Sequence, residues 1–213
     1  MNAKKKIFII GGGGHSKVVF EALTASGLEV AAFLDIDQKK QHTLLMGLPI
    51  LEPNITLTNI DPTRVLLAVG VGGARRQQFE ELKEKGFNIA TVVHPSAIVA
   101  HDVKLGEGAQ LMAGAVVQPG VDVGVNTVLN TGCRVDHDCT IGSHSFIAPG
   151  AVLCGGVNIG DSTHVGAGAV VIENTTIGKN VTVGAGASVT RNIDNRVIVS
   201  GVPARTHKFN KEC

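Results

Sequence analysis

Residues 117–147 read "VQPGVDVGVNTVLNTGCRVDHDCTIGSHSFI", and every sixth residue of this stretch is aliphatic. The same spacing extends from Val99 to Val189, and all sixteen positions in it carry Val, Leu or Ile. The residues two places earlier, from Ala97 to Ala187, are all small or β-branched. One large and one small inward position per six residues is typical of a parallel β-helix, in which each short strand stacks on the equivalent strand of the next coil. Three hexapeptides per coil predict roughly five coils.

Glycine recurs immediately after the aliphatic position of this repeat. These glycines are Gly106, Gly124, Gly142, Gly160, Gly166, Gly178 and Gly184. We interpret them as corners of the β-helix and expect them to need a positive φ, which glycine adopts most readily.

The region before the repeat follows a different pattern, from Lys5 to about Gly86. Short apolar segments, "KKIFII", "LEVAAFLD" and "RVLLAVG", alternate with two helical patterns, "HSKVVFEALTASG" and "GARRQQFEELKEKG". Strands that alternate with helices predict a small parallel sheet. The sequence therefore predicts two domains, an α/β Rossmann-like domain over residues 1–90 and an all-β domain over residues 91–213.

Composition narrows the classes of ligand. The formal net charge is +1 and only 17% of residues are charged, so no strong field favours nucleic acid or a membrane surface. No apolar stretch approaches the roughly 20 residues that span a bilayer. We expect a cytoplasmic protein that binds small molecules. Its four cysteines include no CxxC pair and are interpreted as small apolar residues rather than disulfides or metal ligands.

One histidine stands in an acidic setting within the repeat. His137 lies two places after the inward Val135 and is flanked by Asp136 and Asp138. A histidine beside carboxylates can be held in one tautomer and made more basic, as general-base catalysis near neutral pH requires. A solvated corner histidine is the alternative interpretation.

A shared zinc site is disfavoured by the spacing of the repeat. His101 and His137 share one phase and are 36 residues apart, which is two coils. They should lie on the order of 10 Å apart, given a strand spacing of about 4.8 Å. That is too far for one Zn²⁺ ion with nitrogen ligands at about 2.0–2.1 Å, so we expect no metal.

The first strand leads into "GGGGHSK", a glycine turn at the start of a helix. Free backbone N–H groups and the helix dipole make such a turn an anion site. As a dinucleotide fingerprint it is imperfect, because with Gly11 and Gly13 as the first two glycines the third falls on Ser16. Asp35, about 20 residues further on, is a candidate for a ribose hydroxyl. The motif permits NAD without requiring it.

Five segments together resemble a known family. "IIGGGGHSK", "FLDID", "HPSAIVA", "NTGCRVDHDCTIG" and "SGVPAR" are similar to bacterial nucleotide-sugar acetyltransferases of the sialic-acid O-acetyltransferase-like group, which includes enzymes that N-acetylate UDP- or GDP-linked 4-amino-4,6-dideoxy sugars. The resemblance covers nearly the whole chain and implies a left-handed β-helix of hexapeptide repeats. It implies a homotrimer with active sites between subunits, and acetyl-CoA as the co-substrate.

The resemblance also implies roles for individual residues. His137 would be the general base, oriented by Asp138, with Asn130 in the active site. The nucleotide sugar would be held by Gly13, Gly14, Asp35 and Gly70, with His15 close to the diphosphate or the sugar. Acetyl-CoA would be bound near Gly155, Ala167 and Ala185, with Pro203 and Arg205 at the adenine end. These glycines and alanines also suit the fold alone, and His15 also suits a plain helix start.

One position departs from the family. Relatives carry a second histidine nine places after the base, and this chain has Phe146 there. His144 is the alternative for that contact, unless it is a solvent-facing corner residue.

The resulting hypothesis is acetyl transfer from acetyl-CoA to the 4-amino group of a nucleotide-linked sugar, with UDP slightly preferred over GDP, for bacterial glycan synthesis. O-acetylation of sialic acid or a related sugar is the first alternative. A metal-dependent lyase or a non-catalytic nucleotide-sugar scaffold is the second.

Overall fold

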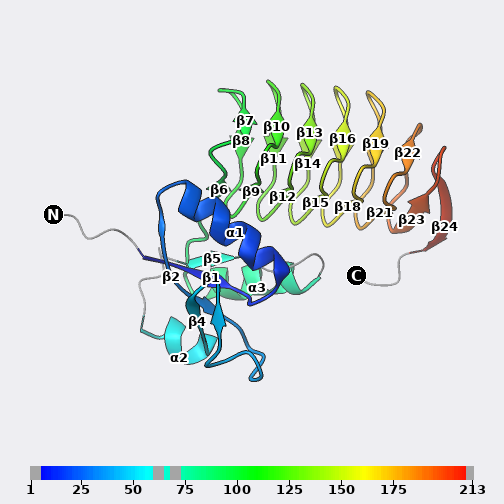
Figure 1. Cartoon of the computed structure of the whole chain (residues 1–213). Coiled ribbons are helices and arrows are strands. Elements are labelled where there is room, and N and C mark those ends of the chain that lie inside the picture. Colours follow the sequence, from blue (N-terminus) through cyan, green and yellow to red (C-terminus); the bar gives the residue numbers. More distant parts are fainter. Residues whose placement is uncertain (1–5, 60–64, 68–72, 210–213) are drawn as a thin grey trace. The chain divides into compact units, whose positions relative to one another are not determined.

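A computed structural model describes residues 6–59, 65–67 and 73–209 (Figure 1). The chain divides into two compact units, Met1–Pro95 and Ser96–Cys213. No helix within the described ranges is long and apolar enough to cross a membrane.

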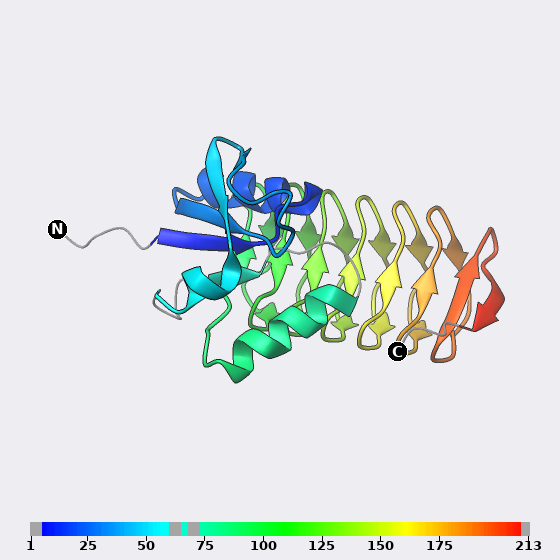
Figure 2. The same ribbon diagram turned by 90° about the horizontal axis from the view of Figure 1, so that it is seen from below.

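The first unit is built around a small, mostly parallel sheet. The sheet order is β3-β4-β2-β1-β5, with β1 parallel to both β2 and β5, β2 parallel to β4, and β3 antiparallel to β4. Helices α1 and α3 lie on opposite faces of this sheet (Figure 2). The elements are β1 (Lys6–Ile10), α1 (Gly14–Ala25), β2 (Glu29–Leu34), β3 (Leu44–Leu45), β4 (Leu48–Leu51), α2 (Pro53–Leu57), β5 (Val65–Leu67), α3 (Gly73–Glu84) and β6 (Val92–Val93).

The sequence predicted β1, α1, β2, β5 and α3 but missed four short elements, β3, β4, α2 and β6. Val19, Ala22 and Leu23 form the buried face of α1, and the chain leaves the helix through Gly27 at φ +73°. The missed hairpin β3–β4 turns at Met46 and Gly47, both with positive φ. Helix α2, which has five residues, was also missed. Elements this short offer too few periods for a pattern to stand out.

The second unit is the parallel β-helix that the repeat predicts. Pairing joins each residue to the one 18 positions later, as in Val116 with Arg134 and Arg134 with Val152, so one coil takes 18 residues. Figure 2 shows the coils following one another in a row as far as the terminal hairpin.

Three sheets form the sides of the β-helix. The first contains β7 (Ile98–Val99), β10 (Val116–Val117), β13 (Arg134–Val135), β16 (Val152–Leu153), β19 (Val170–Val171) and β22 (Ser188–Val189). The second contains β8 (Lys104–Leu105), β11 (Asp122–Val123), β14 (Thr140–Ile141), β17 (Asn158–Ile159) and β20 (Thr176–Ile177). The third includes β9 (Gln110–Leu111), β12 (Val128–Leu129), β15 (Phe146–Ile147), β18 (His164–Val165), β21 (Thr182–Val183), β23 (Val197–Ser200) and β24 (Arg205–Phe209).

The core of the β-helix consists of the two inward positions of each hexapeptide. The aliphatic residues from Leu111 to Val189 are all buried, at 1% exposure or less. Three consecutive small positions on one side are hydroxyl residues that bond to corner carbonyls: Thr127 donates to Gly142 O at 2.8 Å, Ser145 to Gly160 O at 2.9 Å and Thr163 to Gly178 O at 2.7 Å. These bonds satisfy polar groups that burial would otherwise leave unpaired.

The predicted reason for the repeated glycines is wrong. The left-handed corners lie two residues later, at positions such as Asn126 (φ +55°), Asp138 (φ +58°) and Gly150 (φ +69°). Gly124 and Gly142 are instead places where neighbouring coils approach closely. A Cβ on Gly124 would lie 2.5 Å from Ser143 N, and one on Gly142 would lie 2.5 Å from Asp161 N. Glycine is needed there because the backbone of the next coil occupies the space of a side chain.

The C-terminal end of the β-helix is closed by an antiparallel hairpin. Strand β24 pairs with β23, and the Val202–Pro203 peptide bond between them is cis. This hairpin pairs the outer edge of β23, which would otherwise present open backbone groups at the end of the β-helix.

Candidate functional site

The candidate base lies at the corner that follows β13. The register of β7, β10, β13, β16 and β19 stacks five residues on this corner, one per coil. From the first coil onward they are His101, Pro119, His137, Gly155 and Glu173. We call this set the His137 column.

His137 and Asp138 form a hydrogen-bonded pair. His137 Nδ1 lies 2.8 Å from Asp138 Oδ2, and the His137 backbone N–H donates to Asp136 Oδ1 at 2.9 Å. A carboxylate can only accept, so the proton lies on Nδ1 and the lone pair on Nε2. That is the tautomer a base needs. The structure thus brings together two of the predicted catalytic residues.

The acidic neighbours increase the basicity of His137. The hydrogen bond with Asp138, followed by the charge of Asp136, raises the pKa of His137 above its ordinary value. The imidazole is 62% exposed and the Asp138 carboxylate 75% exposed, so the pair can be reached from outside the chain.

Glycines on the two adjacent coils leave room for this pair. A Cβ on Gly155 would lie 2.6 Å from Cε1 and from Nε2 of His137. A Cβ on Gly120 would lie 2.5 Å from Asp138 Oδ1. The sequence analysis missed Gly120, although its place 18 residues before Asp138 gives the signal.

The backbone beside the base offers a free donor. In the described part of the chain, the neighbouring amides Cys154 N–H and Gly156 N–H bond to Val171 O and His137 O, whereas no acceptor is found for Gly155 N–H. This N–H belongs to the residue that packs against the His137 ring, and it remains available to a bound group.

Asn130 lies at a different corner from His137. It follows β12, and its Oδ1 accepts from the backbone N–H of Thr131 at 2.8 Å. The corner column at Thr131 also holds Ala167 and Ala185, both exposed, whereas Gly155 belongs to the His137 column. One side of the β-helix, which contains β13, separates the corner that follows Asn130 from the corner at His137. Within one chain the structure does not bring these two residues together.

The cysteines are not poised as nucleophiles. Burial raises the pKa of Cys133 to about 12, and burial also raises the pKa of Cys139 and of Cys154. Only a thiolate is an effective nucleophile, so these thiols are poorly reactive near neutral pH. Cys213 lies outside the described residues.

Phe146, which stands where the family has a second histidine, forms an aromatic pair with His164. Phe146 and His164 stack in adjacent coils with ring centroids 5.2 Å apart, and burial lowers the pKa of His164. His144 sits at a left-handed corner with φ +60°, its Nδ1 2.9 Å from Asn126 Nδ2. That corner follows β14 and is distinct from the His137 column.

In the first unit, Asp35 holds the glycine turn. Asp35 Oδ2 accepts from Gly12 N–H at 2.8 Å and from Lys40 Nζ at 2.9 Å, and Oδ1 accepts from Asp37 N–H. Burial alone would raise the pKa of Asp35, but these hydrogen bonds hold it below its ordinary value. A ribose hydroxyl bound at Asp35, as predicted, would therefore share a carboxylate that already accepts hydrogen bonds from the loop. Lys40, five residues after Asp35, was missed by the sequence analysis.

The glycine turn before α1 has open space around its backbone. Gly11 has φ +103°, and a Cβ on Gly13 or Gly14 would meet nothing within 4 Å. Gly13 caps α1 without any side-chain hydrogen bond, and the first turn of α1 carries no acidic residue. His15 is the second residue of α1 and is half-buried. Gly70, also predicted at this site, lies outside the described residues.

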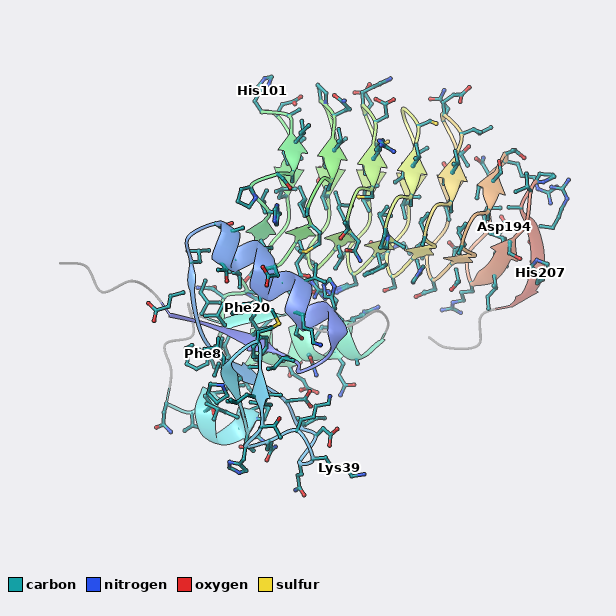
Figure 3. The ribbon with its side chains drawn as sticks, in the orientation of Figure 1. Phe8, Phe20, Lys39, His101, Asp194 and His207 are labelled. Atoms are coloured by element: carbon teal, nitrogen blue, oxygen red, sulfur yellow. The ribbon has the colours of Figure 1, made fainter. Side chains whose placement is uncertain are left out.

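The remaining predicted residues lie in the terminal hairpin. Pro203 and Arg205 are both exposed, and Arg205 bonds to the carbonyl of Ala204. Figure 3 shows His101 projecting from the corner of the first coil. The register of the strands places it two coils before His137. Among the described residues, no group of three or more His, Cys, Asp or Glu side chains is placed to hold a metal ion.

Two family models match the chain. Residues 6–82 match the PglD N-terminal domain, and residues 156–191 match the bacterial transferase hexapeptide model of six repeats.

Relatives and solved structures agree with these matches. PerB, the perosamine N-acetyltransferase from Caulobacter crescentus, solved with CoA and GDP-perosamine, is 36% identical over 97% of this chain and 99% of its own, with a TM-score of 0.89. The acetyltransferase domain of PglB from Neisseria gonorrhoeae FA1090, solved with acetyl coenzyme A, is 35% identical over 96% of this chain and 100% of its own, also with a TM-score of 0.89. UDP-N-acetylbacillosamine N-acetyltransferase from Bacillus subtilis (strain 168) is 38% identical over 115 residues, which are 51% of this chain. The match spans about half, 52%, of that curated relative.

Proposed function

The chain belongs to the family of bacterial hexapeptide acetyltransferases with a PglD N-terminal domain, and from this we propose that it transfers acetyl from acetyl-CoA to the 4-amino group of a nucleotide-linked 4-amino-4,6-dideoxy sugar. The observation that carries the proposal is the His137–Asp138 pair, exposed at a corner and with its Nε2 lone pair free. The relatives solved with CoA, acetyl-CoA and GDP-perosamine support both substrates.

His137 is the proposed general base. An amine attacks a thioester only when it is unprotonated and aligned, so Nε2 removes a proton from the sugar amine as the nitrogen attacks the acetyl carbon. The C–S bond of the tetrahedral intermediate then breaks, and the proton passes to the departing CoA thiolate. No acyl-enzyme forms, which agrees with the raised pKa values of the three described cysteines.

The Gly155 N–H is the proposed donor to the oxyanion. It belongs to the residue that packs against the His137 ring, and no acceptor is found for it among the described residues. A preorganised backbone donor of this kind stabilises the charge that develops on the carbonyl oxygen in the transition state.

The first unit is the proposed site of the nucleotide diphosphate. Gly13 and Gly14 present open backbone at the uncapped start of α1, which favours a phosphate. His15 follows in the first turn of α1. The carboxylate of Asp35 fixes the glycine loop by accepting hydrogen bonds from Gly12 N–H and from Lys40. We propose Gly70 as a further contact, and a slight preference for UDP over GDP.

The proposed active unit is a homotrimer in which each site draws on two subunits. Asn130 and His137 lie on opposite sides of the β13 face within one chain, so a shared site needs another copy to supply one of them. Outward residues of that face include exposed Val170 (38%) and Ile98 (66%), which a partner subunit would cover. Ala167 and Ala185, on the Asn130 corner, together with Pro203 and Arg205 in the terminal hairpin, are the proposed contacts of acetyl-CoA.

The reaction is tested by measuring free CoA with acetyl-CoA and a panel of UDP- and GDP-linked 4-amino-4,6-dideoxy sugars, with free sialic acid as the hydroxyl acceptor. We expect fast release with one amino sugar, and a product heavier by one acetyl group. Release with sialic acid alone would replace the amine by a hydroxyl acceptor. If a folded trimer released no CoA with any acceptor of the panel, the proposed reaction would be contradicted.

A further inference from the structure

Gly155 is unusual among the corner residues of its phase. The sixteen positions that lie two residues after an inward aliphatic residue run from His101 to Arg191, and Gly155 is their only glycine. The others include proline, alanine, threonine and charged residues. Gly155 does not have a positive φ, unlike its neighbour Gly156 at φ +68°. The fold of the corner therefore does not require glycine at this position.

The space beside Gly155 is filled by the candidate base. The three nearest atoms to a Cβ built on Gly155 are Cε1 and Nε2 of His137 at 2.6 Å and Cδ2 at 3.2 Å. By contrast, a Cβ on Gly142 or Gly124 would meet the backbone of the next coil. At Gly155 a methyl group would thus collide with one movable side chain rather than with the framework.

We propose that Gly155 is a positioning residue, whose missing side chain leaves room for the His137 imidazole against the next coil while Nδ1 bonds to Asp138. This inference rests on the proposed function, in which His137 is the base. It concerns the absence of a side chain at Gly155, which is a different matter from any contact between the Gly155 backbone and acetyl-CoA.

An added methyl group would displace the ring. Non-bonded carbon atoms rest about 3.5–4.0 Å apart, so the imidazole must retreat by about 1 Å from a Cβ at this position. A displacement of that size at a reacting group can lower the rate by about 100-fold. The hydrogen bond between Nδ1 and Asp138 is the main cause of the raised pKa of His137, so we expect a displacement that disturbs this bond to lower the pKa.

The test is Gly155→Ala in the full-length chain, with two readouts. We expect kcat to fall by about 100-fold while the KM for acetyl-CoA stays within about two-fold. In an NMR titration of the His137 ring, its pKa should fall toward the ordinary value of a histidine. Ser143→Thr, which adds one methyl group at the same phase of another corner, is the matched control and should change neither quantity.

A double variant separates the possible origins of any loss. In the His137→Ala background, Gly155→Ala should cause no further loss of rate and no loss of thermal stability, because the ring that the methyl group meets is gone. Instability of the single variant that is absent from the double variant would also support the contact. Equal instability in both would overturn the proposal.

The titration tests this inference even if the reaction proves to be a different one, because it needs no acceptor. An unchanged His137 pKa in Gly155→Ala, together with a raised KM for acetyl-CoA, would overturn the positioning role and assign Gly155 to the cofactor alone. A failed acceptor panel with a lowered His137 pKa would instead contradict the proposed function and leave the positioning role in place.

Discussion

At the scale of single residues, the left-handed backbone conformation of Asp138 both forms the corner and allows its hydrogen bond with His137. Its φ of +58° makes the corner, and the same turn brings its carboxylate back to the ring of the preceding residue. Aspartate and asparagine tolerate this left-handed region better than most residues. The residue proposed to orient the base is therefore also one that suits the corner.

Replacing Asp138 by Asn keeps the corner and removes the charge. We expect the pKa of His137 to fall, because the carboxylate stabilises the protonated imidazole. His137 acts as a base only when neutral, so activity is lost as the pH falls through its pKa. The acidic limb of the kcat/KM profile should thus move to lower pH in Asp138→Asn, while kcat at the plateau drops by about 10-fold or more.

Asp122→Asn, on the exposed face of the second sheet, is the control and should leave the profile unchanged. An acidic limb that stays in place in Asp138→Asn would show that the limb does not report the His137–Asp138 pair.

The sequence singled out His137 as a candidate because a histidine flanked by two carboxylates stands out at a corner of a repeat whose phase is known, and the family resemblance implied the role of Asp138. The 18-residue period places Gly155 on the coil after His137, but it could not reveal that the ring packs against this glycine, because a repeat period does not fix a side-chain rotamer. It also could not reveal that Asp35 is committed to Gly12 and Lys40, since a loop of irregular geometry has no period to read.

At the scale of elements, the hexapeptide rung was predictable and the reason for its glycines was not. The sixteen aliphatic positions all point inward as expected, because a two-residue strand leaves one inward position per side. The glycines that follow them were assigned to positive φ, but that conformation lies two residues later, where Asn126 and Asp138 also occur. Sequence spacing gives the period of the corner and does not give the dihedral angle of each residue in it.

This distinction predicts different costs for two glycines. Gly124→Ala places a methyl group 2.5 Å from Ser143 N and should destabilise the fold by about 1–3 kcal/mol, as overpacking commonly does. Gly150→Asn, at an open left-handed corner, should cost less than about 1 kcal/mol because asparagine occupies equivalent corners. Thermal unfolding of both variants measures the difference. A less stable Gly150→Asn than Gly124→Ala would contradict the assignment of the two glycine classes.

At the scale of the whole molecule, the proposed active site draws on more than one chain. Asn130 and His137 sit at different corners, and His137 is 62% exposed in the single chain. Water around an open base weakens electrostatic catalysis, whereas a covering subunit would exclude it. Cyclic trimers present two different surfaces at each interface, so one copy can supply Asn130 and its neighbour His137.

Mixed trimers test this arrangement. Asn130→Ala and His137→Ala should each be nearly inactive, yet co-assembly in equal amounts should restore about a quarter of the wild-type activity, because that fraction of interfaces joins two intact residues. Each variant assembled only with itself serves as the control. Mixtures no more active than their components would place both residues in a site within one chain.

The most direct measurement is the single-turnover rate of acetyl transfer by His137→Ala, with the amino-sugar acceptor identified in the panel and with nucleotide-sugar affinity measured alongside. We predict a rate lower by about 100- to 10,000-fold with affinity unchanged, whereas His101→Ala, at the same corner two coils away, keeps the wild-type rate. A normal rate in His137→Ala would contradict the assignment of His137 as the base.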